Sequence, residues 1–88
     1  MDHELHLQDE FIAGILNQLY MNREKHKKHH DRDIHFMYEI GNEQYGQLGG
    51  AIALDDIERQ EQEIYHTAAI LYELLERVEN AKKAILEN

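Results

Sequence analysis

The chain lacks cysteine, proline and tryptophan altogether over its 88 residues. Without cysteine it cannot form disulfides or thiolate metal sites. No apolar run approaches the roughly 20 residues that a membrane-spanning helix needs. The start, MDHELHLQDE, has neither the basic nor the apolar region of a signal peptide. We therefore expect a cytoplasmic protein that does not enter a membrane and folds as a single domain over residues 1–88.

Positive charge is scarce outside one short segment, and the net charge of the chain is -9. Residues 23–33 hold five Lys/Arg against three acids, whereas residues 34–88 hold 11 acids against four bases. Nucleic-acid phosphates would be repelled by most of this surface, so direct nucleic-acid binding is not expected. The charge suits a protein partner with a basic surface, or cations held by clustered carboxylates.

The apolar residues recur every three or four positions, which predicts an all-α fold of three long helices. The predicted helices cover residues 4–28, 33–53 and 56–87. Two breaks, HHDRD and LDD, separate them. Each break offers an aspartate as helix N-cap, namely Asp31 or Asp33 in the first and Asp55 or Asp56 in the second.

The third predicted helix is longer than its neighbours, at roughly 45 Å. A heptad pattern places one line of apolar residues along it, formed by Ile57, Ile64, Leu71, Val78 and Ile85. The adjacent line holds Ala68 and Leu75, with Glu61 and Lys82 at its ends. Val78, Ile85 and Leu86 would be bare in a monomer. We therefore expect a homodimer, in which helical hairpins assemble into a four-helix-type bundle.

Glycines concentrate in the second predicted helix, at positions 41, 46, 49 and 50, although each costs about 1 kcal/mol relative to alanine in a helix interior. We expect Gly41 and Gly49 to permit close approach of another helix. The tyrosines of the second and third helices lie on or beside the apolar stripes and are expected in the core: Tyr38, Tyr45, Tyr65 and Tyr72.

The segment MYEIGNEQYGQLGGAIALDDIERQEQEIYHTAA and its surroundings, residues 37–79, resemble the all-α nucleotide pyrophosphohydrolases of the MazG-like group. That group carries EExxE on one helix and ExxD on the next, and these acids hold magnesium against a triphosphate. Glu43 falls on the first acid of EExxE and Glu63 on the first acid of ExxD. Gln44 and Gln47 stand where the other EExxE acids belong, and His66 stands where the last carboxylate belongs.

The resemblance implies a candidate metal site for Mg²⁺ or Mn²⁺ in an active protein, formed by Glu43, Gln47, Glu63 and His66. It also implies that Arg23, Lys25 and Lys28 meet substrate phosphates; alternatively, these cations are favoured by the dipole of a helix C-terminus. His26 and His30 have the i, i+4 spacing of a chelating pair, although a solvated turn accounts for them equally simply.

Amides and imidazole replace three of the expected carboxylates, and Mg²⁺ prefers carboxylate oxygens. We therefore expect an acidic MazG-like helical protein that has lost full catalysis and acts by binding a partner, as an inhibitor or regulator of the kind that phages encode. The alternative is an active nucleoside triphosphate pyrophosphohydrolase with a variant metal site. Release of pyrophosphate from nucleoside triphosphates distinguishes the two.

Overall fold

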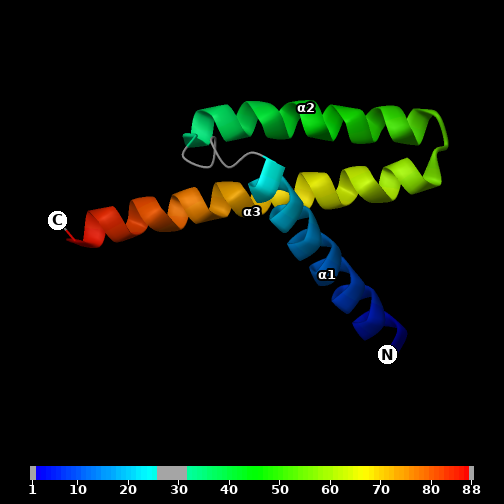
Figure 1. Cartoon of the computed structure of the whole chain (residues 1–88), viewed down its shortest axis with the longest axis horizontal. Coiled ribbons are helices and arrows are strands. Elements are labelled where there is room, and N and C mark those ends of the chain that lie inside the picture. Colours follow the sequence, from blue (N-terminus) through cyan, green and yellow to red (C-terminus); the bar gives the residue numbers. More distant parts are fainter. Residues whose placement is uncertain (1, 26–31, 88) are drawn as a thin grey trace.

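The computed structural model describes residues 2–25 and 32–87, and side chains from residue 8 onward. These residues form three α-helices and no strand: α1 (Asp2–Lys25), α2 (Ile34–Ala53) and α3 (Ile57–Glu87) (Figure 1). The all-α prediction is confirmed, with the second and third helices bounded within a residue or so of their predicted limits. The predicted end of the first helix and His26, Lys28, His29 and His30 lie outside the described residues.

Asp33 is the N-cap of α2. Its carboxylate accepts a hydrogen bond from the backbone N–H of Phe36 at 2.9 Å, which satisfies one of the free donors in the first turn. The preceding Arg32 places its guanidinium 4.6 Å from the centroid of the Phe36 ring. The predicted choice between Asp31 and Asp33 thus falls on Asp33 within the described part of the chain.

The connection between α2 and α3 is a tight reversal made by three residues, Leu54, Asp55 and Asp56. The backbone N–H of Asp56 donates to the Ala51 carbonyl and that of Asp55 to the Ile52 carbonyl, both at 3.1 Å. This is the Schellman pattern, which needs a left-handed residue after the helix end; Asp55 supplies it with φ 56°. Asp56 then caps α3, since its carboxylate accepts from the Arg59 N–H at 3.2 Å.

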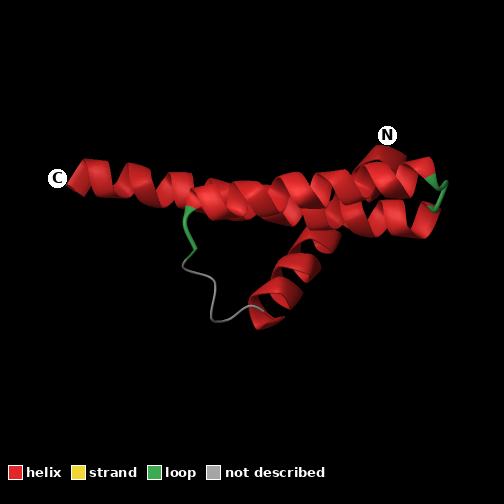
Figure 2. Cartoon of the chain, turned by 90° about the horizontal axis from the view of Figure 1, so that it is seen from above, coloured by secondary structure: helices red, strands yellow, loops and turns green. Residues whose placement is uncertain are grey.

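Because the reversal is so short, α2 and α3 lie antiparallel along each other as a hairpin (Figures 1 and 2). The side of α2 that faces α3 is half-buried or buried, and consists of Met37, Ile40, Gly41, Gln44, Leu48 and Ala51. Tyr38, Tyr45 and Ile52 are exposed instead. The expected placement of Tyr38 and Tyr45 in the core was therefore wrong, as was that of Tyr72 on α3, which is also exposed.

Helix α1 crosses α3 obliquely (Figure 1). At the crossing, the Tyr65 ring lies against Gly14: a Cβ at that position would come within 2.6 Å of Tyr65 Cδ1 and Cζ. Phe11 completes the contact, with its ring centroid 6.1 Å from that of Tyr65 at an interplanar angle of 37°. Gly14 is therefore the glycine on which the closest helix approach depends.

The glycines of α2 behave differently from one another. A Cβ at Gly41 would lie 3.3 Å from Ile70 Cγ2 on α3, so the predicted close approach at Gly41 is confirmed. A Cβ at Gly46, Gly49 or Gly50 would meet nothing within 4 Å. The predicted packing role of Gly49 is wrong within this chain, because that residue points away from α3.

The core is thin. The buried apolar residues of the described chain are Leu19, Ala51, Ala69 and Ile70. Helix α3 runs on past the start of α2 as an overhang (Figures 1 and 2), so that Ile85 and Leu86 are 74% and 85% exposed. The apolar line of α3 lies on an uncovered face over its whole length, since all five of its members are exposed: Ile57, Ile64, Leu71, Val78 and Ile85.

Candidate functional site

Glu63 is the buried acid of the described chain, with only 8% of its surface exposed, and it lies in the interface between α2 and α3. The side-chain amide of Gln44, across on α2, donates a hydrogen bond to its Oε2. A buried charge is costly unless it is paired or hydrogen-bonded. The Gln44–Glu63 bond meets that requirement and fixes the register between the two helices.

This bond brings together two positions of the EExxE and ExxD pattern, but not the set predicted for a metal. Glu43 and Gln47 are exposed, His66 is half-buried and Glu63 is turned to Gln44. Among the described side chains, residues 8–25 and 32–87, no group of three or more acidic or histidine residues is arranged to hold a metal ion. Glu43, Glu63 and His66 are therefore not gathered into such a group.

Arg23, predicted to meet substrate phosphates, is engaged by carboxylates of α3. Its Nε donates to Glu73 Oε1 at 3.2 Å, and its Nη2 donates to Glu76 Oε2. The hydrogen bond to Glu76, with Glu73 adding in the same direction, raises the pKa of Arg23 above its ordinary value. Lys25 is exposed at the end of α1, and Lys28 lies outside the described residues.

Glu73 joins Arg23 to a second arginine. Arg77 donates through Nη1 to Glu73 Oε2 at 3.2 Å and to the Glu73 carbonyl at 2.8 Å. Its Nε donates to the backbone carbonyl of Arg32, immediately before α2, at 2.6 Å. These bonds link α1, α3 and the start of α2 at one point, which positions the three helices relative to one another.

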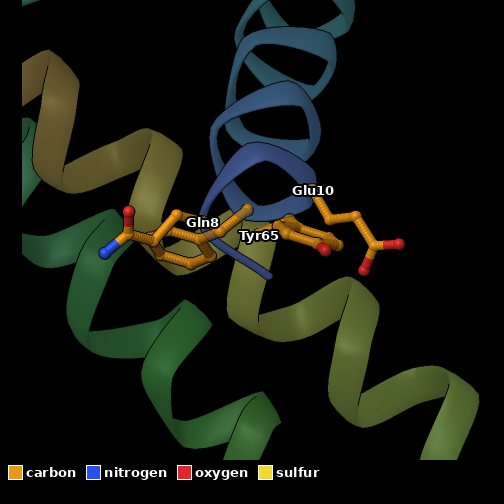
Figure 3. Close-up of a pocket in the computed structure, with 4 residues that line it drawn as sticks. Gln8, Glu10 and Tyr65 are labelled. Carbon is orange, nitrogen blue, oxygen red and sulfur yellow. The ribbon is translucent and has the colours of Figure 1, made fainter. Parts of the chain in front are cut away.

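An open depression of about 390 Å³ lies where α1 crosses α3, lined by Gln8, Glu10, Phe11 and Tyr65. Figure 3 shows the Tyr65 ring between the Gln8 side chain and the Glu10 carboxylate. The site combines two aromatic rings with a carboxylate at its rim. Such rings attract cations above their faces, and the carboxylate adds charge complementarity, so the depression suits a lysine or arginine side chain.

Sequence reasoning missed this depression. Its residues come from two helices, and the signal that could have found it is Gly14, a lone glycine within the apolar pattern of the first helix. A glycine at such a position indicates close backbone approach. The partner in that approach, Tyr65, could not be chosen among the tyrosines without the crossing angle of α1.

Together these features define an all-α protein built from an antiparallel helical hairpin that a third helix crosses. Comparison of the chain with protein-family models, with curated proteins and with solved structures finds no match. None of the described helices is long and apolar enough to cross a membrane.

Proposed function

We propose that this chain acts by binding a protein partner with a basic surface, as a MazG-like helical protein without a full catalytic set, in the manner of an inhibitor or regulator. The observation that carries the proposal is the hydrogen bond from Gln44 to the buried Glu63. The side-chain amide N–H of Gln44 donates to the Glu63 carboxylate, which the family pattern assigns as a metal ligand.

The neighbouring groups support the same conclusion. A magnesium site that serves phosphate chemistry needs carboxylate oxygens converging on one point. Glu43 and Gln47 are exposed on α2, and Gln44 contributes a donor rather than a charge. Arg23, which the resemblance assigns to substrate phosphates, is held by Glu73 and Glu76.

The exposed charges indicate the chemistry of the partner. Four acidic residues lie in the α2–α3 turn and the first turns of α3: Asp55, Asp56, Glu58 and Glu61. Arg59 is the one base within residues 55–61. Glu58 lies seven residues before Tyr65 and so on the same side of α3. A partner whose lysine or arginine enters the depression beside Tyr65 would therefore also meet Glu58. Opposite charge raises the association rate as well as the affinity.

The same proposal includes self-association. Two copies would bury the uncovered apolar residues of α3, so that two α2–α3 hairpins contribute the helices of a four-helix-type bundle. Asp55 and Asp56 lie in the turn and Glu58 lies off the apolar line of α3, so these three acids stay available to a basic partner.

The test combines binding with catalysis. The binding probe is a fluorescent, lysine- and arginine-rich amphipathic helical peptide, followed by anisotropy beside an acidic peptide of matched hydrophobicity. We expect binding to the basic peptide alone, weakening as salt rises. The variant Glu58→Gln should bind more weakly, whereas Glu39→Gln, which removes the same charge on α2, should bind as the parent does.

The catalytic arm incubates the unmodified protein with nucleoside triphosphates and Mg²⁺ or Mn²⁺ and measures pyrophosphate. We expect none above the uncatalysed rate. Multiple-turnover release that disappears in Glu63→Gln would establish the alternative, a pyrophosphohydrolase with a variant metal site. Failure to bind the basic peptide would remove the proposal of a basic partner.

A further inference from the structure

A continuous face of α3 is left uncovered by the rest of the chain. We define the α3 seam as the residues that follow one another at alternating spacings of four and three along it: Ile57, Glu61, Ile64, Ala68, Leu71, Leu75, Val78, Lys82 and Ile85. All are exposed except the half-buried Ala68. This average spacing of 3.5 residues is the pattern by which one helix packs along another.

Neither α1 nor α2 covers this seam. Helix α2 and Arg32, just before it, contact α3 through Glu63, Ile70 and Arg77, which lie roughly 130° around the helix from the seam at 100° per residue. Helix α1 contacts α3 through Tyr65 and Glu73, on a third side. The apolar members of the seam therefore face solvent, with Leu71 at its middle 60% exposed.

The chain exposes more surface than a compact monomer of its mass, enough to accommodate a partner. The chain has a solvent-accessible surface of 7217 Å² at a mass of 10.5 kDa. A compact monomer of that mass would expose about 5,400 Å². The excess, about 1,800 Å², is more than the roughly 800 Å² that each partner buries in a stable protein–protein interface. The radius of gyration, 15.0 Å, likewise exceeds the about 12 Å of a compact domain of this length.

The two charges in the seam indicate which partner fits. Glu61 lies near one end and Lys82 near the other. A second copy packed parallel would place Glu61 against Glu61 and Lys82 against Lys82, which repel. A second copy packed antiparallel, with Leu71 of one chain against Leu75 of the other, places Glu61 within one helical turn of Lys82 from the other copy, twice by symmetry. The seam is therefore self-complementary in the antiparallel orientation alone.

We infer that α3 packs antiparallel against α3 of a second copy through the α3 seam, with Glu61 of each chain paired to Lys82 of the other. This rests on the self-association in the proposed function, and not on the basic partner. It specifies the face, the direction and the register of the contact. It also accounts for the overhang of α3, because Val78, Lys82 and Ile85 of one copy then cover the first half of α3 in the other copy.

The first experiment measures mass by light scattering and sedimentation at micromolar concentrations. The parent should be a dimer. Glu61→Lys and Lys82→Glu should each raise the dimer dissociation constant at least tenfold, because each places like charges together. The double variant Glu61→Lys/Lys82→Glu should restore dimerisation.

Leu71→Glu should give a monomer. Leu16→Glu, which changes a comparably exposed apolar residue on α1, should leave the mass unchanged, and circular dichroism should show every variant to be helical.

The second experiment measures direction. The chain has no cysteine, so Glu87→Cys gives a single site for a nitroxide label. Antiparallel packing about the Leu71–Leu75 centre should separate the two labels by about 40 Å, whereas parallel packing would bring them within about 20 Å. The short distance, a parent that stays monomeric, or a dimer that Leu71→Glu leaves intact would each overturn the inference. Binding of the basic peptide would still test the partner independently.

Discussion

The Tyr65 ring on α3 occupies the space beside Gly14 on α1 that any larger residue at position 14 would need. Gly14→Ala should therefore displace the ring, which is held in turn by Phe11. We expect a loss of about 1–3 kcal/mol in the free energy of unfolding, the usual cost of overpacking, measured by urea denaturation. Gly46→Ala is the matched control, since its new methyl meets nothing; it should stabilise the chain by up to about 1 kcal/mol.

The steric origin of that loss can be checked by removing the ring. In a Tyr65→Ala background the added methyl of Gly14→Ala has room, so the helix propensity of alanine should make the substitution neutral or favourable. An equal loss in both backgrounds would mean that the methyl does not meet Tyr65.

Gly41 is the second position where a side chain is excluded, here by Ile70 across the hairpin. Gly41→Leu should force α2 away from α3 and cost about 1–3 kcal/mol, seen as a lower melting temperature in circular dichroism. Gly49→Ala, on the uncovered side of the same helix, should raise the melting temperature. A parent-like melting temperature for Gly41→Leu would show that α2 does not rely on this contact.

The helix boundaries could be predicted from the sequence because their causes are local. Asp33 and Asp56 cap their helices through bonds to residues three positions away, and the apolar spacing fixes the helix type in between. Which side of each helix is buried could not be predicted as well. The apolar residues of α2 spread over a wide arc, so a rotation of one residue, about 100°, decides whether Tyr38 and Tyr45 are inside or outside.

The candidate site, too, could be predicted only in part, because the side of each helix that faces its neighbour was not known. The helices that carry Glu43 and Glu63 do lie antiparallel (Figure 1), but the described structure does not gather Glu43, Glu63 and His66 into one metal-binding group. The residue facing Glu63 is Gln44 rather than Glu43 or Gln47. The Arg23–Glu73–Arg77 chain of bonds could not be found from spacing, since Arg23 and Glu73 belong to helices whose crossing the sequence does not specify.

The Gln44–Glu63 pair makes a direct test of the proposal that these helices carry a degenerate metal site. The triple variant Gln44→Glu, Gln47→Glu and His66→Asp restores the carboxylates of the family pattern and places one of them against Glu63. Like charges in a partly buried interface should lower the melting temperature without metal, and Mg²⁺ should raise it again by binding the folded state. Calorimetric titration should show tighter Mg²⁺ binding than in the parent, with pyrophosphate release measured beside it.

Gln62→Glu, which adds a carboxylate at an exposed position of α3, controls for charge alone and should show no response to Mg²⁺. If the triple variant binds Mg²⁺ no better than the parent, these two helices do not form the family's site. Of the two functions considered, only binding to a partner would then remain.

Asp55 adopts the left-handed conformation at the end of α2 without being glycine. That conformation costs an ordinary residue about 1–2 kcal/mol, and glycine is the usual choice at this point of a Schellman motif. Asp55→Gly removes this cost but also increases the entropy of the unfolded chain, which partly cancels the gain. The net effect should be a rise of up to about 1 kcal/mol in the stability of the hairpin. Asp55→Val should lower it. Denaturant midpoints of the two variants, compared with Asp55→Asn, would measure the effect.

The narrow attachment of α1 gives the molecule two parts that can open separately. Among the described side chains of α1, Leu19 is the buried apolar one, while most of the large apolar ones face solvent: Phe11, Ile12, Leu16, Tyr20 and Met21. Detaching α1 breaks the Tyr65 contact and the Arg23 ion pairs, yet leaves the Schellman turn and the Gln44–Glu63 bond in place. Amide protons of α1 should therefore exchange with deuterated water by local opening, at a rate that does not depend on the stability of the hairpin. Amide protons around Ala51 and Ile70 should exchange only through global unfolding.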